Sequence, residues 1–172
     1  MKSLAELQVL VVDDNAQMRF LLKELLRAGG VRFIYDAPTA DAAIALMRVH
    51  EIDIVTVDWC MQPVDGIALA NRLRRSPDSP NPYVSIVMIS AHSERSRVEG
   101  ARDAGVNGFL VKPISARLVF DRISAALNDN RPFVRSASYF GPDRRHAPVV
   151  SYMGPFRRET DKEQDALLLD AG

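Results

Sequence analysis

Five polar side chains stand where runs of apolar residues end, and their types together suit phosphoryl chemistry. Each closes or follows an apolar stretch typical of a buried strand; the five are Asp13, Asp14, Asp58, Ser90 and Lys112. Clustered carboxylates repel one another and raise their own pKa values unless a cation joins them. A hard divalent cation such as Mg²⁺ suits an all-oxygen site and keeps waters that a phosphate can replace. Because an aspartate can accept a phosphoryl group covalently, Asp58 in the middle of the chain is the natural nucleophile.

The remaining groups can be assigned to roles around that nucleophile. The expected metal ligands are Asp13, Asp14, Asp58 and the backbone carbonyl of Cys60. Lys112 can pair with a phosphate oxygen as a point charge. The hydroxyl of Ser90 can bond a phosphoryl oxygen only when one is present, which would make it a switch. The alternative is a carboxylate–lysine cluster with a purely structural role.

The elements that must position these groups alternate along the chain. Strands are expected over 7–12, 31–35, 53–57, 84–89 and 108–111, and helices from Asn15 to Gly29 and over 38–50, 67–75, 93–104 and 115–127. Such alternation predicts right-handed crossovers and a parallel sheet covered on both faces. We therefore expect an α/β fold, a flavodoxin-like (βα)5 doubly wound parallel sheet. All five polar groups then fall at carboxyl ends of strands and can meet at one rim.

Composition bounds the class of protein. The chain has 172 residues with 47% hydrophobic and 26% charged side chains, which is typical of one soluble globular domain with an appendage. No apolar run is long enough for a signal peptide or a membrane span. A single cysteine, Cys60, excludes a disulfide framework, so we expect a cytoplasmic protein.

Residues 7–128 resemble the receiver domain of a two-component response regulator. The resemblance rests on VLVVDDN at 9–15, on Asp58 followed by Met61 and Asp65-Gly66, on Ser90-Ala91 and on Lys112-Pro113. It implies a bacterial protein that takes a phosphoryl group onto Asp58, with Mg²⁺, from a sensor histidine kinase or phosphotransfer protein. It also implies no enzymatic activity beyond this phosphoryl transfer and its own dephosphorylation.

The resemblance further implies a cis Lys112–Pro113 bond and a switch formed by Ser90 and Phe109. Two positions depart from the family pattern. Gln62 stands where the family usually has proline, with Pro63 one place later, so the loop after Asp58 is expected to differ in shape. Phe109 lacks the hydroxyl of the commoner tyrosine, so its movement would rest on packing.

A second region, 129–172, follows the receiver at 1–128. Residues 131–158 carry six arginines against one aspartate, whereas residues 159–172 carry five acids against one lysine. Ser138-Tyr139-Phe140-Gly141-Pro142-Asp143-Arg144-Arg145 returns as Ser151-Tyr152-Met153-Gly154-Pro155-Phe156-Arg157-Arg158. Because Gly, Pro and Ser disfavour helix and sheet, we expect this tail to be largely disordered by itself, with a short helix near its acidic end.

The repeated segment joins aromatic rings to paired guanidiniums. Arginine binds phosphate bidentately and matches the O6/N7 edge of guanine, and aromatic or guanidinium planes stack on bases. A duplicated segment suits a two-fold symmetric ligand, and cyclic di-GMP has guanines, phosphates and that symmetry. The expected nucleotide-binding residues are Arg135, Tyr139, Asp143, Arg144, Arg145, Tyr152, Arg157 and Arg158.

The tail also resembles the arginine-rich extension of CheY-like c-di-GMP effector proteins. That resemblance implies a single-domain response regulator whose ligand-bound tail docks on a protein target such as the flagellar motor. Two alternatives stay open: a plain phosphorelay or chemotaxis receiver with an inert tail, and a receiver whose tail binds nucleic acid. The acidic end disfavours nucleic acid because it would repel phosphates.

Overall fold

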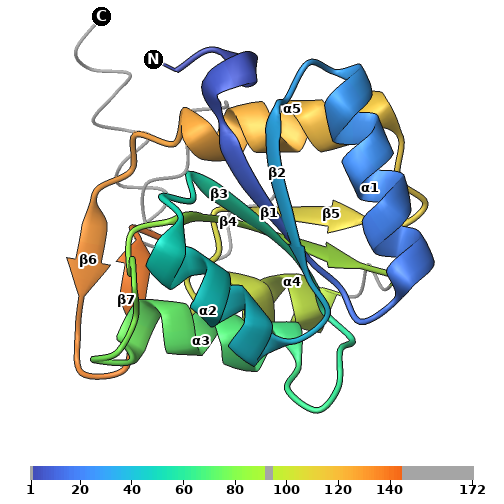
Figure 1. The fold of residues 1–172 in the computed structure, drawn as a ribbon. Coiled ribbons are helices and arrows are strands. Elements are labelled where there is room, and N and C mark those ends of the chain that lie inside the picture. Colours follow the sequence, from blue (N-terminus) through green and yellow to red (C-terminus); the bar gives the residue numbers. More distant parts are fainter. Residues whose placement is uncertain (1, 92–94, 145–172) are drawn as a thin grey trace, which may run out of the picture.

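The chain folds around a five-stranded parallel sheet with strand order β2-β1-β3-β4-β5 (Figure 1). The structure is a computed structural model, and it describes residues 2–91 and 95–144. The strands are β1 (Gln8–Val12), β2 (Phe33–Ala37), β3 (Ile54–Asp58), β4 (Ser85–Ser90) and β5 (Gly108–Val111). This order is that of the flavodoxin-like arrangement, so the expected fold class is confirmed.

Five helices connect and cover the strands. They are α1 (Ala16–Ala28), α2 (Ala40–Val49), α3 (Gly66–Arg75), α4 (Arg95–Asp103) and α5 (Ala116–Leu127), and a 3₁₀ turn (Leu4–Glu6) precedes β1. Asn15 caps α1 by accepting from the amides of Gln17 and Met18, as its sequence position predicted. Asp65 caps α3 by accepting from the Ala68 amide. The first residues expected in the fourth helix, 93 and 94, lie outside the described ranges.

Side chains alternate between the two faces of the sheet, as strand geometry requires. Along β1, Leu10 and Val12 pack under α2 and α3, whereas Val9 and Val11 pack under α1 and α5. Every residue of β3 is buried, which explains why the sequence of this strand is a continuous apolar and β-branched run. No helix within 2–91 and 95–144 is long and apolar enough to cross a membrane.

The first copy of the repeated segment is part of the folded body. Residues Phe133–Arg135 (β6) and Phe140–Pro142 (β7) form an antiparallel hairpin beside α3 (Figure 1). The expectation that Gly, Pro and Ser keep this stretch out of sheet is therefore wrong for β6 and β7. The hairpin forms because it packs against the rest of the protein: Tyr139 and Phe140 are each only 5% exposed. The second copy and the acidic end lie outside the described residues.

Candidate functional site

The three carboxylates expected at the rim converge. One oxygen from each of Asp13, Asp14 and Asp58 lies within 4.8 Å of the others. Asp13 and Asp58 are 2% and 6% exposed, whereas Asp14 is exposed. They come together because Val12 of β1 pairs with Val57 of β3, so both strands end at the same level. The site thus has a closed floor and one side open to solvent.

Lys112 ties this cluster to the end of β5. Its Nζ donates to Asp58 Oδ1 at 2.6 Å and lies 3.7 Å from Asp13 Oδ2. Burial would lower the pKa of Lys112, but the hydrogen bond and charge of Asp58 outweigh that effect and raise it. One cation therefore stands among three carboxylates.

Burial raises the pKa of Asp13, and the charge of Asp58 adds to this, while the Asn15 amide and Lys112 oppose it. The rim keeps a surplus of negative charge on oxygen donors alone. That donor set fits a hard divalent cation, which would be held by Asp13, Asp14 and Asp58. No described contact bears on the backbone carbonyl of Cys60, so its ligand role stays a prediction; its side chain is exposed.

The loop between β1 and α1 is held by contacts that sequence reasoning missed. Arg19 donates from Nη1 to the carbonyl oxygen of Asp13 at 2.8 Å and to that of Asp14 at 3.3 Å. Its Nε donates to Asp36 at 3.0 Å. The backbone amide of Gln62 donates to Asp14 Oδ2 at 3.1 Å. In the sequence, Arg19 could have been found only from its position in the first turn of α1, three residues after Ala16. An arginine at such a position is equally consistent with a solvated side chain.

Ser90 and Phe109 occupy the neighbouring strands. Ser90 is 1% exposed at the carboxyl end of β4, and its carbonyl accepts from the Lys112 amide at 2.7 Å. Phe109 on β5 packs edge-on against Trp59, with ring centroids 6.4 Å apart. The Arg97 guanidinium lies 5.3 Å from the centroid of the Trp59 ring. The contacts of Trp59 with Phe109 and Arg97 thus connect the residue after Asp58 to β5 and α4.

One loop feature expected from the resemblance is present in the structure, beside two that were not predicted. The Lys112–Pro113 bond is cis, as the resemblance implied, and the Gln62–Pro63 bond is cis as well. At Gly66, a Cβ would overlap the carbonyl oxygen of Asp58 and come within 2.9 Å of Val57 Cγ1. Glycine is therefore required there for α3 to start this close to the end of β3.

The tail residues expected to bind nucleotide are only partly described. Arg135, Tyr139, Asp143 and Arg144 line a cavity of about 260 Å³ together with Val134 and Ser136. The Arg144 guanidinium lies 4.1 Å from the Tyr139 ring centroid, and that of Arg135 lies 4.2 Å from the Phe140 centroid. Tyr139 Oη donates to the Pro142 carbonyl at 2.6 Å. Arg145, Tyr152, Arg157 and Arg158 lie outside the described residues.

Burial changes what Tyr139 can do within the docked hairpin. Its ring is 5% exposed and already bears Arg144 on a face, so it supports that arginine instead of presenting an open stacking surface. Arg135 and Arg144 are both exposed. The part of the tail that is described therefore presents guanidinium planes outward and aromatic rings inward.

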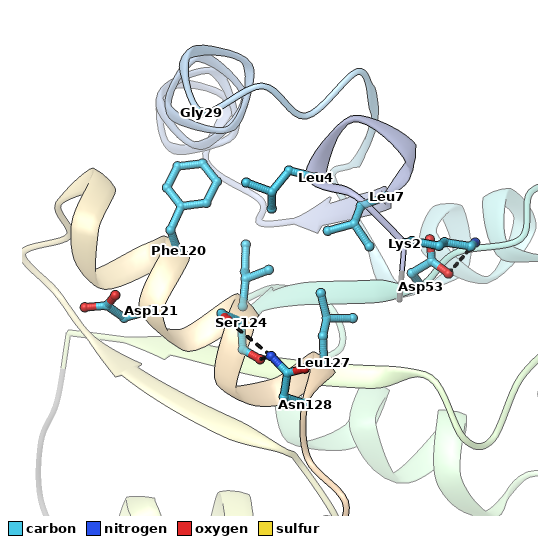
Figure 2. Close-up of a pocket in the computed structure, with 11 residues that line it drawn as sticks. Lys2, Leu4, Leu7, Gly29, Asp53, Phe120, Asp121, Ser124, Leu127 and Asn128 are labelled. Carbon is cyan, nitrogen blue, oxygen red and sulfur yellow. Dashed lines mark hydrogen bonds and ion pairs between the residues drawn. The ribbon is translucent and has the colours of Figure 1, made fainter.

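A larger hollow, of about 700 Å³, lies between α1, α5 and the N-terminal segment (Figure 2). Leu4, Leu7, Phe120 and Leu127 form much of its lining, and the ion pair between Lys2 and Asp53 stands at one end, with 2.7 Å between Nζ and Oδ1 (Figure 2). None of the predicted site residues lines it. Its mainly apolar wall does not suit phosphoryl chemistry, so the rim remains the candidate site.

Comparisons with known proteins agree with this geometry. A family model described as "Response regulator receiver domain" matches residues 9–124. Chemotaxis protein CheY-3 of Vibrio cholerae is 32% identical over 117 residues, spanning 68% of this chain and 88% of its own length. Chemotaxis protein CheY of Bacillus subtilis is 32% identical over 121 residues, spanning 70% and 98%. Transcriptional regulatory protein PdtaR of Mycobacterium tuberculosis is 35% identical over 121 residues, spanning 70% and 57%.

Solved structures place the fold in the same group. CheY4 of Vibrio cholerae superposes with a TM-score of 0.65 at 21% identity, over 70% of this chain and 98% of that one. CheY of Borrelia burgdorferi, solved in a complex with CheX, BeF₃ and Mg²⁺, superposes with a TM-score of 0.62 at 27% identity, over 69% and 87%. The matches cover the five-stranded body described above.

Proposed function

The chain belongs to the response regulator receiver domain family, and from this we propose that Asp58 is its phosphoryl acceptor. A carboxylate oxygen of Asp58 attacks the phosphorus of a phosphohistidine on a kinase or phosphotransfer protein. The P–N bond breaks, and the imidazole leaves with the electron pair. The observation that carries the proposal is the convergence of Asp13, Asp14 and Asp58 around one cation, Lys112.

The neighbouring groups fit that reaction. Asp13, Asp14, Asp58 and the backbone carbonyl of Cys60 would hold Mg²⁺, which neutralises charge on the transferring phosphoryl group. Lys112 already stands 2.6 Å from Asp58 Oδ1, so it can move onto a phosphoryl oxygen with little rearrangement. Ser90 and Phe109 are the switch pair: the hydroxyl bonds the new phosphoryl oxygen, and the ring repacks beside Trp59.

Phosphorylation by acetyl phosphate tests this part directly. We expect a single Mg²⁺-dependent phosphorylated species, resolved by phosphate-affinity electrophoresis, that disappears in Asp58→Asn. The matched control is Asp121→Asn, which changes an exposed aspartate on α5. Phosphorylation that persists in Asp58→Asn at the wild-type level would refute the assignment.

For the tail, the proposed ligand is cyclic di-GMP, held by Arg135, by Arg144 and Arg145 of the first copy and by Tyr152, Arg157 and Arg158 of the second. The cavity beside Arg135 and Arg144 is of a size for one base, and Asp143 at its edge can accept from a guanine N1/N2 edge. A base would stack on the outer plane of Arg144, with Tyr139 beneath. The ligand-bound tail would then dock on a protein target, flagellar-motor components being one class.

Calorimetry separates this proposal from the two alternatives. We expect cyclic di-GMP to bind the full chain with micromolar affinity or better, and Arg144→Ala/Arg145→Ala to abolish binding. An inert tail predicts no heat at all, whereas a nucleic-acid-binding tail predicts salt-steep binding of an oligonucleotide and no preference for the cyclic dinucleotide. Equal binding of GTP would also refute specific recognition. Phosphorylation by acetyl phosphate in each variant verifies that the receiver is folded.

A further inference from the structure

The hairpin docks on a surface at the amino ends of β4 and β5, opposite the acidic rim. The centre of this surface is Arg74, which is 1% exposed and donates to the carbonyls of Gly105 and Pro82 at 2.9 and 2.8 Å and to Asn107 Oδ1 at 2.9 Å. All three acceptors belong to the receiver body. The docking surface is therefore built without any contribution from the tail.

Aromatic rings fill the space between this surface and the hairpin. Phe133 lies over the Arg74 guanidinium at 5.1 Å. Tyr83, Phe133 and Phe140 form a three-ring cluster with centroids 5.2 to 5.6 Å apart. Phe140 is the only one of these rings that belongs to the repeated segment, and the second copy has Met153 in its place. A methionine thioether also packs favourably against aromatic rings.

The other contacts that shape the hairpin and hold it on this surface are made by residues that both copies share. Gly141 allows close approach, since a Cβ there would lie 2.7 Å from the Cα of Gly105. Tyr139 Oη donates to the Pro142 carbonyl, and Arg144 forms an ion pair with Asp103 at the end of α4. The second copy repeats each of these residue types at the same spacing, as Tyr152, Gly154, Pro155 and Arg157.

The one remaining difference removes the carboxylate of Asp143, whose charge acts on Arg131. Where the first copy has Asp143, the second has Phe156. The backbone amide of residue 143 donates to the Pro132 carbonyl at 2.8 Å, and any residue except proline can supply that donor.

We propose that the surface formed by Arg74, Tyr83, Asp103 and Gly105 is a docking site for a Tyr-x-Gly-Pro-x-Arg segment, and that the second copy of the same chain exchanges with the first on it. The proposal rests on the docking contacts and the repeat, so it stands whether or not the tail binds a nucleotide. It makes the tail a two-state element in which either copy, but not both, is docked.

Chain connectivity sets which copy prevails. In the structure β6 and β7 are joined by four residues, 136–139, whereas pairing β6 with 153–155 would need a connection of 17 residues, 136–152. Loop closure alone then favours the first copy by roughly nine-fold. The state with the second copy docked is thus a minor one, and an experiment must accumulate it irreversibly.

Disulfide trapping does so. In a Cys60→Ser background of the full chain, Asp103→Cys is combined with Arg144→Cys to report the first copy or with Arg157→Cys to report the second. The matched control combines Asp103→Cys with Val150→Cys, which lies between the copies, nearer along the chain than 157 but outside the repeat. Under oxidation the 103–144 pair should close fastest, the 103–157 pair roughly ten-fold more slowly, and the 103–150 pair more slowly still.

Blocking the first copy sharpens the test. Gly141→Val places a side chain against Gly105, so it should speed closure of the 103–157 pair several-fold. Adding Gly154→Val should return that pair to the rate of the 103–150 control. A 103–157 rate equal to the control, or unchanged by Gly141→Val, overturns the proposal. Disulfide-linked dimers in place of internal bonds at micromolar protein overturn the assignment to one chain.

Discussion

Replacing Tyr139 with phenylalanine isolates one hydrogen bond of the docked hairpin. The Oη atom donates to the Pro142 carbonyl at 2.6 Å, inside a site where the side chain is 5% exposed. Removing it leaves that carbonyl without this donor, at a cost of about 1–3 kcal/mol. The ring and its contact with Arg144 remain, so the substitution tests the hydroxyl alone.

Native-state hydrogen exchange reports the effect locally. The amides of Ser136 and Asp143, which donate to the Tyr139 and Pro132 carbonyls, are exposed to exchange when the hairpin undocks. In Tyr139→Phe their exchange should speed about 5- to 150-fold, while amides in β3 stay unchanged. Unchanged exchange at both positions would show that the hairpin does not depend on this hydroxyl.

The same residue gives a pH dependence whose sign follows from its burial. Burial raises the pKa of Tyr139 above its ordinary value of 10.0, although Arg144, Arg131 and Arg74 oppose this. The stabilisation that the neutral hydroxyl gives to the docked hairpin is fully present below pH 10.0, the pKa of Tyr139 in the unfolded chain. It is lost as the pH rises through the higher pKa of Tyr139 in the folded protein. The difference in docking free energy between wild type and Tyr139→Phe should therefore become smaller above pH 10.

The difference between alkaline absorbance titrations of the two proteins gives the pKa of Tyr139 directly. A midpoint above 10.0 supports the docked geometry, because burial disfavours the charged phenolate. A midpoint at or below 10.0 would refute the burial of this side chain, and with it the hydrogen bond from its hydroxyl to the Pro142 carbonyl.

Three further predictions concern the acidic rim. Asp13→Asn should remove about 1 kcal/mol of unfavourable burial and repulsion, and so raise the melting temperature of the Mg²⁺-free protein by about 2–4 °C. It should also reduce the stabilisation by added Mg²⁺. An unchanged or lower melting temperature would contradict the surplus of negative charge at the rim. Lys112→Met leaves Asp58 buried without its lysine and should destabilise by about 3 kcal/mol in urea unfolding, partly recovered by adding Asp58→Asn; equal losses in the single and double variants would argue against the pairing. Gly66→Ala should slow phosphorylation and destabilise by at least about 1 kcal/mol, whereas Gly108→Ala, with an ordinary 3.5 Å contact, serves as the control.

The fold and the rim were predictable because both follow from local pattern and topology. Because β1 and β3 are buried on both faces of the sheet, they appear in the sequence as continuous apolar and β-branched runs. Once the strands are parallel, residues that end them must share an edge, which brings Asp13, Asp58 and Lys112 together without further information. Their burial and spacing in the structure agree with that expectation.

Arg74 and the hairpin were not predictable in this way. Arg74 ends an amphipathic helix in a run of basic residues, where solvent exposure is the ordinary expectation, yet it is buried against acceptors up to 33 residues away in the chain. Gly105 meets the hairpin with φ +79°, and a Cβ there would lie 2.6 Å from the Phe140 carbonyl. Such long-range complementarity leaves no periodic trace, so composition alone suggested disorder.

The positions of the two sites constrain any communication between them. The rim lies at the carboxyl ends of β1, β3, β4 and β5, and the docked hairpin at the amino ends of β4 and β5, roughly 20 Å away along a six-residue strand. Several elements of the receiver body reach both ends, and β4 and α4 are two of them. Strand β4 runs from the neighbourhood of Tyr83 to Ser90, and α4 carries Arg97 beside Trp59 near its start and Asp103, the partner of Arg144, at its end.

A phosphoryl group on Asp58 can therefore influence the hairpin only if it favours one of two arrangements of these elements, since coupling requires a state that both sites bias. The ion pair between Asp103 and Arg144 is the contact where a displaced α4 would be felt first, because the other hairpin contacts are made by α3 and by the loops before β4 and β5. Both copies of the repeat carry an arginine at this position. A shift of α4 would consequently weaken whichever copy is docked, and so would alter how strongly the tail is held more than which copy holds it.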